Sequence, residues 1–496
     1  MKTIIKEKLP LILAIVLICS PLLDVLTALT VTAGFPISIG VVCRALFMAA
    51  AFFYVVFWAK FPEKKYCLAI LGVLCAYLLA FMAHLFLTGG LSLCLHNVQE
   101  TAKTYFAPII IVFLYAVYKE YGQILTTQSI AIAGAIYTSI ILIAYLTGTS
   151  FISYADSGYG YCGWFFAANE VGCIVSITAP ITIYYCLTIL PTVDTWWKKL
   201  FMMWTFATII FSANFIGTKV VFLFVLTYCI AAFLWMFISG KQKKLSPWGI
   251  YRRRSACILG VMVLILVGLY AASPLSEYLE NIYTEIMKED SVIRAISTNQ
   301  EMEADSANTW MRSLLENNKS LDKLDQILSR RLTAASPSIE VFIESDFAGK
   351  LFGIGYATAE SYSRTVDYMI EMDFIAVLIR HGIVGFAVYA MPYLVFIGWA
   401  IINFFAHIKE NIINFRYCTY LFSTLAAFAI AFVAGHALVS PAVATFSIVV
   451  SMNLWTGVKE KTSAFSELKM TSANLQKVGA QQENKRINYH KVAWSR

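Results

Sequence analysis

The sequence predicts an all-α polytopic membrane protein, with about twelve transmembrane helices and one large loop outside the cytoplasm. Of the 496 residues, 59% are apolar and only 14% are charged, and the mean hydropathy is +0.69. In a soluble domain, about a quarter of the residues would be charged. Apolar stretches of roughly 20 residues recur along the chain, and this length crosses the hydrocarbon core of a bilayer.

The apolar stretches give the expected order of spans. The first stretch is longer than a signal peptide. It carries Asp24 where a small-residue cleavage site would stand, so we expect it to stay as an anchored helix. The expected spans are 9–31, 37–59, 66–88, 101–118, 123–147, 164–190, 199–214, 217–239, 255–272, 382–404, 416–435 and 438–457.

Basic residues predict which links face the cytoplasm. Lysine and arginine precede the first span and recur in every second link, for example at Lys64 and Lys119. The links 32–36 and 148–163 carry none. Because cytoplasmic links are enriched in lysine and arginine, we expect both termini in the cytoplasm and residues 273–370 on the opposite side.

The long polar stretch divides the chain into four expected parts. Residues 1–272 form a bundle of about nine transmembrane helices, and residues 273–381 form the large extracytoplasmic loop. Residues 382–458 hold the last transmembrane helices. Residues 459–496 are rich in lysine, glutamine and asparagine and are expected to form a flexible cytoplasmic tail. Apolar residues at helical spacing predict that 275–330 is mostly helical.

The composition excludes several function classes. The net charge of +8 is spread over many short links, which does not fit a nucleic-acid surface. The eleven cysteines lie mostly within apolar stretches and lack the spacing of a zinc site, so no metal is expected. The absence of a phosphate-binding glycine loop makes ATP hydrolysis improbable.

Ionisable residues inside or beside the spans suggest an outward cavity. Arg44 lies within the second span. It either reaches the outer headgroups or lines a cavity that takes an anionic ligand. Asn169 and Glu170 open the sixth span, where Glu170 offsets a helix N-terminus or pairs with a cation. Lys219 opens the eighth span and opposes the helix dipole, so we expect an anion nearby, with Asp24 as another candidate partner.

Two outer turns carry residues suited to a ligand. Gly353 and Gly355 can adopt positive φ and let a ligand approach closely, beside Tyr356. His436 falls in the last outer turn, where it is either a hydrogen-bonded turn residue or a catalyst.

Charged residues gather where the loop re-enters the membrane. Arg364, Asp367 and Glu371 are spaced to share one face of a helix. Asp373 lies two residues further on, about 200° around that helix, so Glu371 and Asp373 are not expected to act as one carboxylate pair. A further short helix is expected over 339–343.

Clustered arginines and carboxylates favour transfer of a sugar from a lipid diphosphate. Guanidinium groups suit the departing diphosphate. A carboxylate or histidine can take the proton of the acceptor hydroxyl. Because the lipid diphosphate is already activated, no cofactor is expected. The alternative is that these charges only keep the loop solvated.

Short motifs carry a family resemblance. Leu351–Tyr356, Glu371–Asp373 and Gly382–Gly385 resemble motifs of the O-antigen ligase and polymerase family of bacterial membrane proteins. The expected layout, with about twelve helices and one large outer loop before the last spans, is similar to that of the family. Ala168–Gly172, Phe215–Lys219 and Gly435–Ala442 also look like segments of that family.

The resemblance implies a GT-C type membrane glycosyltransferase bundle, like that of the peptidoglycan polymerases of the shape-and-division family. It implies a polyprenyl-diphosphate-linked oligosaccharide donor, transfer at the outer face of the bacterial plasma membrane, and no metal. It places the loop arginine at Arg330 or Arg331 and the base at Glu371. Ligases usually carry His-Asn near that point, whereas this chain has Glu371–Asp373, which favours a polymerase.

We therefore expect a polymerase that joins lipid-linked repeat units of a capsule or exopolysaccharide in the bilayer, together with a chain-length regulator or other assembly proteins. A single-transfer ligase and a lipid-linked sugar transporter or flippase are the alternatives. The expected residues are Arg330, Arg331, Arg44, Lys219 and Arg364 for the diphosphate, Glu371, Asp373 and His436 for catalysis, and Asn169, Glu170, Gly353, Gly355 and Tyr356 for the substrate.

Overall fold

The computed structural model confirms an all-α polytopic membrane protein. It describes residues 2–35, 38–154, 159–189, 195–238, 249–274, 276, 331–356 and 370–456. Among these residues, nine helices are long and apolar enough to cross a membrane. The loop helices expected before residue 331, the tail expected from residue 459, Arg330 and Arg364 all lie outside the described residues.

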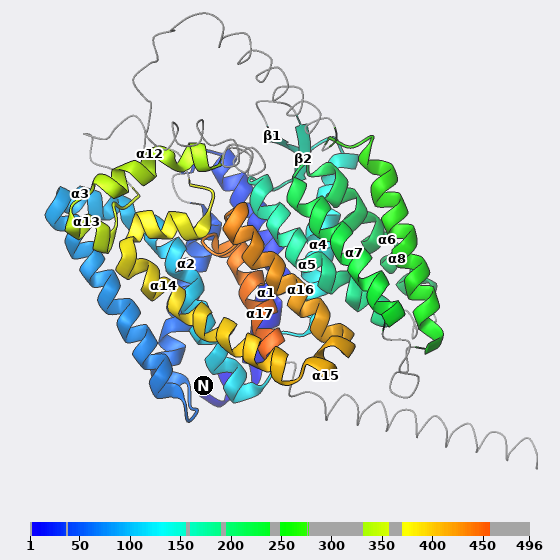
Figure 1. Cartoon of the computed structure of the whole chain (residues 1–496), viewed down its shortest axis with the longest axis horizontal. Helices are drawn as coiled ribbons and strands as arrows, with labels where there is room; N and C mark the ends of the chain where they lie inside the picture. The colour runs from blue at the N-terminus through cyan, green and yellow to red at the C-terminus, as the bar shows by residue number, and fades with distance from the viewer. Residues whose placement is uncertain are drawn as a thin grey trace, which may run out of the picture.

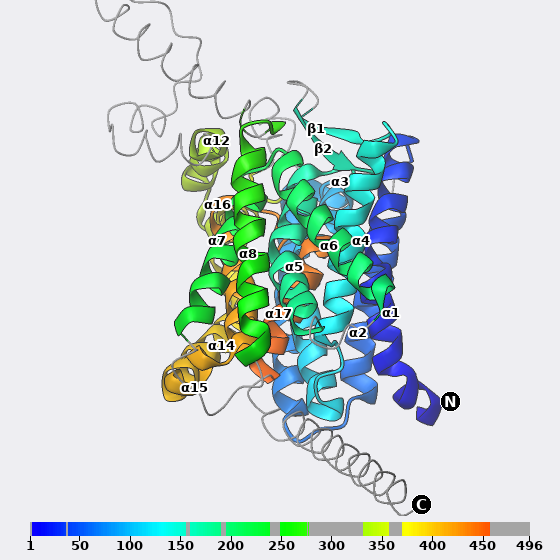
Figure 2. The same ribbon diagram turned by 90° about the vertical axis from the view of Figure 1, so that its right-hand side faces the viewer.

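One bundle of helices carries a single β-hairpin in the described ranges. The elements are α1 (Lys2–Thr32), α2 (Ile39–Phe53) with the π-helical turn η1 (Tyr54–Trp58), α3 (Lys64–Tyr121), α4 (Thr127–Leu146), β1 (Phe151–Tyr154), β2 (Tyr159–Gly163), α5 (Ala168–Ile189), α6 (Trp196–Phe215), α7 (Lys219–Ile238), α8 (Gly249–Tyr270), α12 (Arg331–Glu344), α13 (Phe347–Phe352), α14 (Asp373–Ala406), α15 (Ile408–Ile413), α16 (Phe415–Val433) and α17 (Pro441–Thr456). The antiparallel hairpin and α12 lie at one end of the bundle, and α15 and the start of α1 lie at the other (Figures 1 and 2).

Two expected spans, 66–88 and 101–118, are the arms of α3. A straight helix of its 58 residues would be about 87 Å long, far more than a bilayer requires. The chain turns back at Gly90, where φ is 72° and ψ is −166°, a conformation that glycine adopts without a steric penalty. The arms then lie side by side, since Lys119 Nζ is 2.9 Å from Glu63 Oε1. The link expected between them is therefore mostly helical.

α14 also bends at a glycine. Gly382 has φ 68° and ψ −177°, so the expected start of this span at residue 382 coincides with the bend. The residues after α13 lie against it, because Ile354 N donates to Ile379 O at 3.1 Å and Gly355 N donates to Arg380 O at 3.0 Å. This contact brings the outer end of α14 next to the segment that follows α13.

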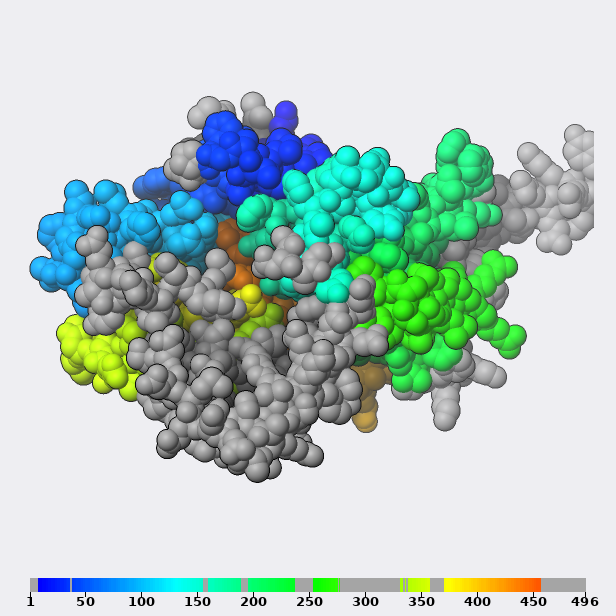
Figure 3. Space-filling view, turned by 90° about the horizontal axis from the view of Figure 1, so that it is seen from above, coloured from blue at the N-terminus to red at the C-terminus, as the bar shows by residue number. Residues whose placement is uncertain are grey.

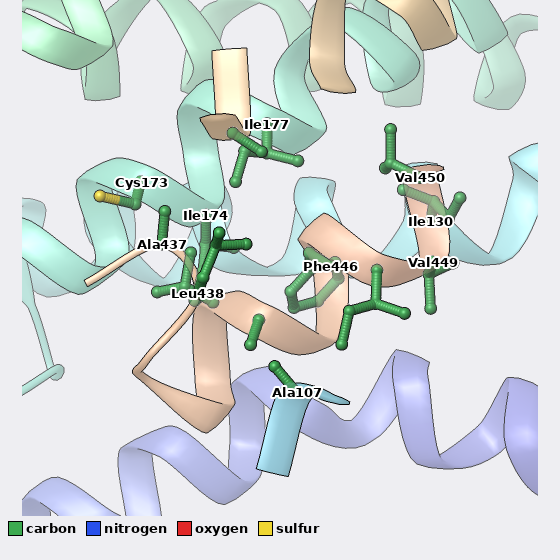
Figure 4. Packing of buried hydrophobic residues seen from close by; sticks show 14 of the residues in the cluster. Ala107, Ile130, Cys173, Ile174, Ile177, Ala437, Leu438, Phe446, Val449 and Val450 are labelled. Atoms are coloured by element: carbon green, nitrogen blue, oxygen red, sulfur yellow. The ribbon is translucent and has the colours of Figure 1, made fainter. Parts of the chain in front are cut away.

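α17 lies in the middle of the bundle. Its side chains Phe446 and Val449 pack among residues of α3, α4 and α5, including Ala107, Ile130 and Ile174 (Figure 4). Because α17 is surrounded, the turn that precedes it is held inside the bundle. The last expected outer turn, which precedes α17, is therefore surrounded by other helices.

Candidate functional site

A cavity of about 1200 Å³ brings together residues from distant parts of the chain. Its walls come from α1, α2, α3, the β-hairpin and α5, and from the segments around residues 370–380 and 436–442. Seen from the end that carries α12, C-terminal residues show at the base of a hollow between the N-terminal helices and the α4–α5 region (Figure 3). The volume can hold several sugar rings.

Many of the residues expected at a site meet in this cavity. The lining includes Arg44, Asn169, Glu170, Tyr356, Glu371 and His436. Arg331, Lys219, Gly353, Gly355 and Asp373 lie outside the lining residues. Lys219 does begin α7, as expected.

Arg331 and Glu371 form an ion pair at the cavity. Arg331 Nε donates to Glu371 Oε2 at 2.6 Å, and its Nη1 donates to Val433 O at 3.1 Å. Both side chains are largely buried, with 16% and 24% of their surface exposed. Arg331 is the first residue of α12, so this helix delivers its guanidinium to the carboxylate.

Glu371 is not in a helix, contrary to the expectation that it shares a helix face with Arg364. α14 begins two residues later, at Asp373. Ile370 and Met372 are buried in a small apolar cluster with Ala335 of α12. Ile370 and Glu371 both line the cavity. The same cluster holds α12 above the site.

Asp373 binds the backbone of the turn before α17. Its Oδ1 accepts from His436 N at 2.6 Å, and its Oδ2 accepts from Ala437 N at 2.9 Å and from Leu438 N at 2.7 Å. Only 1% of the Asp373 surface is exposed. The two carboxylates are therefore separate in position, as expected, and Glu371 alone of the two lines the cavity.

The turn itself has an unusual backbone. His436 has a φ of 61° and is, within the described ranges, the one residue other than glycine with a positive φ. Its neighbour Gly435 has a φ of 68°, and a Cβ there would collide with the carbonyl oxygen of Glu371. The turn thus packs directly on the backbone of Glu371 while His436 lines the cavity.

A second ion pair lies on the opposite wall. Arg44 of α2 pairs with Asp24 of α1, and Tyr137 of α4 donates to the other oxygen of that carboxylate. Both Asp24 and Arg44 line the cavity. Of the two interpretations of Arg44, the structure supports the cavity-lining cation, and its partner is Asp24 rather than Glu170.

Tyr356 is fixed by a network that the sequence did not indicate. Its N–H donates to Asn97 Oδ1 at 2.5 Å, and its hydroxyl lies 3.0 Å from His381 Nε2 and also contacts Thr104. Burial raises the pKa of the Tyr356 phenol. This tyrosine therefore stays neutral and can offer the cavity a ring face and a hydrogen-bonding group.

Arg380 is a cation that sequence reasoning missed as a site residue. It lines the cavity, and its Nη1 donates to Gly355 O at 3.0 Å. Its guanidinium carbon is 5.7 Å from the centre of the Tyr356 ring. Its position two residues before Gly382, at the start of an apolar span, was a usable signal, because an arginine beside an apolar span needs a polar environment.

Gly353 and Gly355 allow the segment after α13 to pack closely against α14 and α3. A Cβ at Gly353 would collide with the Arg380 carbonyl, and a Cβ at Gly355 would press on Asn97. Both have positive φ, as expected. They pack against protein atoms in place of the ligand that the sequence suggested.

The chain was compared with known proteins. The sequence model described as "O-antigen ligase like membrane protein" matches residues 6–461. This range includes every element given above except the first residues of α1. A search of curated proteins gives no match.

Proposed function

Because the chain belongs to the O-antigen ligase-like family of membrane proteins, we propose that it polymerises polyprenyl-diphosphate-linked oligosaccharide repeat units. The family indicates a glycosyl-transfer enzyme. The observation that carries the proposal is Glu371, which lines a large cavity and forms an ion pair with Arg331 directly behind it. This ion pair holds a cation that can bind the diphosphate next to a carboxylate that can take the proton of the acceptor.

Arg331 would bind the diphosphate of the donor. A guanidinium offers a planar pair of donors that match phosphate oxygens. The incoming diphosphate competes with Glu371 for Arg331, so binding of the donor would release the carboxylate. Arg380 lines the cavity and adds positive charge to it, whereas the charge of Arg44 is balanced by Asp24 on the same wall.

Glu371 would then act as the general base. The acceptor hydroxyl oxygen attacks the anomeric carbon, the bond from that carbon to the diphosphate oxygen breaks, and the hydroxyl proton passes to Glu371. The lipid diphosphate leaves with the electron pair of the broken bond. No further reactant is needed, because the donor bond is already activated.

An apolar stripe on α2 fits a lipid-linked substrate. Val42 and Leu46 line the cavity and are exposed, and the exposed stripe continues along the helix to Phe53 and Phe57. The stripe runs from the cavity towards the opposite end of the bundle. It would let a polyprenyl chain remain in the bilayer while its sugars enter the cavity.

The proposed setting is the bacterial plasma membrane, with the cavity at the outer face. The start of α1 lies at the opposite end of the bundle (Figure 2). The end of α17 lies there too, since the Trp455 ring is 5.1 Å from that of Tyr115 near the Lys119–Glu63 pair. Lysines precede the first span, so we assign this end to the cytoplasm.

A product ladder tests the proposal. The full chain is placed in liposomes with a polyprenyl-diphosphate oligosaccharide, and the products are separated on a gel. Evenly spaced bands are expected. A single addition to a distinct acceptor would indicate a ligase, and substrate movement without a new bond would indicate a transporter.

A further inference from the structure

We propose that His436 contacts the substrate and that Asp373 is a positioning residue that presents His436 to the cavity. This inference rests on the proposed glycosyl transfer. His436 would donate a hydrogen bond to the diphosphate oxygen as its bond to the sugar breaks. Such a contact strengthens as charge develops on that oxygen, so it mainly accelerates the chemical step.

The backbone at His436 is the first observation. A φ of 61° is disfavoured for a residue with a Cβ, whereas glycine adopts it freely. Residues held in such conformations concentrate at functional sites. The chain places a histidine at this position, next to Gly435, and this residue lines the cavity. The conformation thus costs stability at a position that borders the cavity.

The carboxylate of Asp373 is the second observation. It accepts three backbone N–H groups of residues 436–438 at 2.6–2.9 Å. Hydrogen bonds to an ionised acceptor are stronger than those to a neutral one, so they can hold the turn in a disfavoured conformation. Because Asp373 is buried and outside the cavity lining, it acts through the turn and does not touch the substrate.

The turn is also tied to the proposed base. Gly435 packs on the carbonyl of Glu371, and Arg331 donates to both Glu371 and Val433. Asp373 follows Glu371 by two residues. The base, the arginine and the histidine therefore form one connected unit, and a change in the turn would move the imidazole relative to Glu371.

Two single variants and their combination test the inference in the liposome assay. His436→Gly removes the imidazole but keeps a residue that adopts positive φ. We expect kcat to fall about tenfold or more with little change in KM, and thermal stability to be kept or increased. Asp373→Asn replaces an acceptor by a group that cannot accept all three N–H groups, and it should also lower kcat. His407→Gly, at the other end of the bundle, serves as the control and should keep the wild-type rate.

The double variant separates positioning from a purely structural role. If Asp373 acts through His436, Asp373→Asn should lower kcat little further in the His436→Gly background. An equal loss in both backgrounds would overturn the role of Asp373. A wild-type kcat in His436→Gly would overturn the whole inference, even if Asp373→Asn fails to fold. A wild-type protein that forms no product would instead refute the proposed function.

Discussion

Two carboxylates that line the same cavity, Asp24 and Glu371, each pair with an arginine, and they differ in how fully the carboxylate is held. Asp24 is bound at both oxygens, by Arg44 and by Tyr137, so the three residues join three helices. Glu371 is bound through Oε2 by Arg331, and among the described residues no hydrogen bond reaches its Oε1. The first pair is therefore fixed in the helix wall, whereas the second can exchange partners when an anion enters.

This difference assigns the two pairs to different tasks. A fully bound carboxylate balances the charge of its cation and holds the cation in place. This matters for Arg44 because it lies within a membrane span. A carboxylate with one open oxygen can accept a proton from a substrate. Variants at Glu371 should then act on the rate, and variants at Asp24 should act on stability.

The largest expected effect is the loss of product formation rate in Glu371→Gln. Loss of a general base typically lowers the rate by about 10²–10⁴-fold. Initial rates of product formation measure this, divided by the amount of folded protein because the change also leaves the largely buried Arg331 without its counter-charge. Glu63→Gln is the matched control, since Glu63 also pairs with a cation but lies at the opposite end of the bundle. A large rate loss in the control would show that the assay reports general damage.

The next effect is on the stability of Asp24→Asn. It leaves Arg44 without its counter-charge in a largely buried position, which costs about 3–5 kcal/mol. Thermal unfolding in detergent measures the loss. The double change Asp24→Leu with Arg44→Met removes both charges and should recover much of the stability. A failure of the double change to recover stability would show that the pair does more than neutralise charge.

A smaller effect is expected for Arg331→Ala. Loss of a hydrogen bond to a charged group is worth about 1.5–3 kcal/mol, so kcat/KM for the donor should fall roughly 10–150-fold. Arg331→Lys keeps the charge but loses the paired donors, and it should recover only part of this loss. Full recovery by lysine would mean that charge alone is required.

The smallest effect is expected for Tyr137→Phe. It removes one hydrogen bond to Asp24 while Arg44 keeps its counter-charge. Stability should fall by about 1.5–3 kcal/mol, because the lost bond goes to a charged group, and the rate should stay within about twofold of the wild type. A rate loss as large as that of Glu371→Gln would contradict the separation of the two pairs.

Most of the spans were predictable because each depends on a local run of apolar residues, although α6 and α17, expected as spans, are not among the nine described helices long and apolar enough to cross a membrane. The bends at Gly90 and Gly382 agree with this pattern, since one joins two expected spans and the other begins one. Arg44 stood out because a charge within an apolar run is costly. His436 stood out because it lies in an outer turn.

The pairings within the site were not predictable. The three backbone bonds of Asp373 join residues more than 60 positions apart, and local spacing carries no information on them. Glu371 was assigned to a helix from its spacing to Arg364, but α14 begins only at Asp373, where the neighbours of Glu371 pack beneath α12. Gly353 signalled close approach correctly, while the identity of the approaching group depends on the tertiary fold.

The most direct test of the account compares Glu371→Gln and Asp24→Asn in one experiment. Each purified protein is reconstituted with the lipid-linked oligosaccharide, and the rate of ladder formation is divided by the amount of folded protein. The account predicts that Glu371→Gln abolishes most of the normalised rate and that Asp24→Asn largely keeps it. A normalised rate that survives Glu371→Gln and is lost in Asp24→Asn would contradict the assignment of the reaction to the Arg331–Glu371 pair.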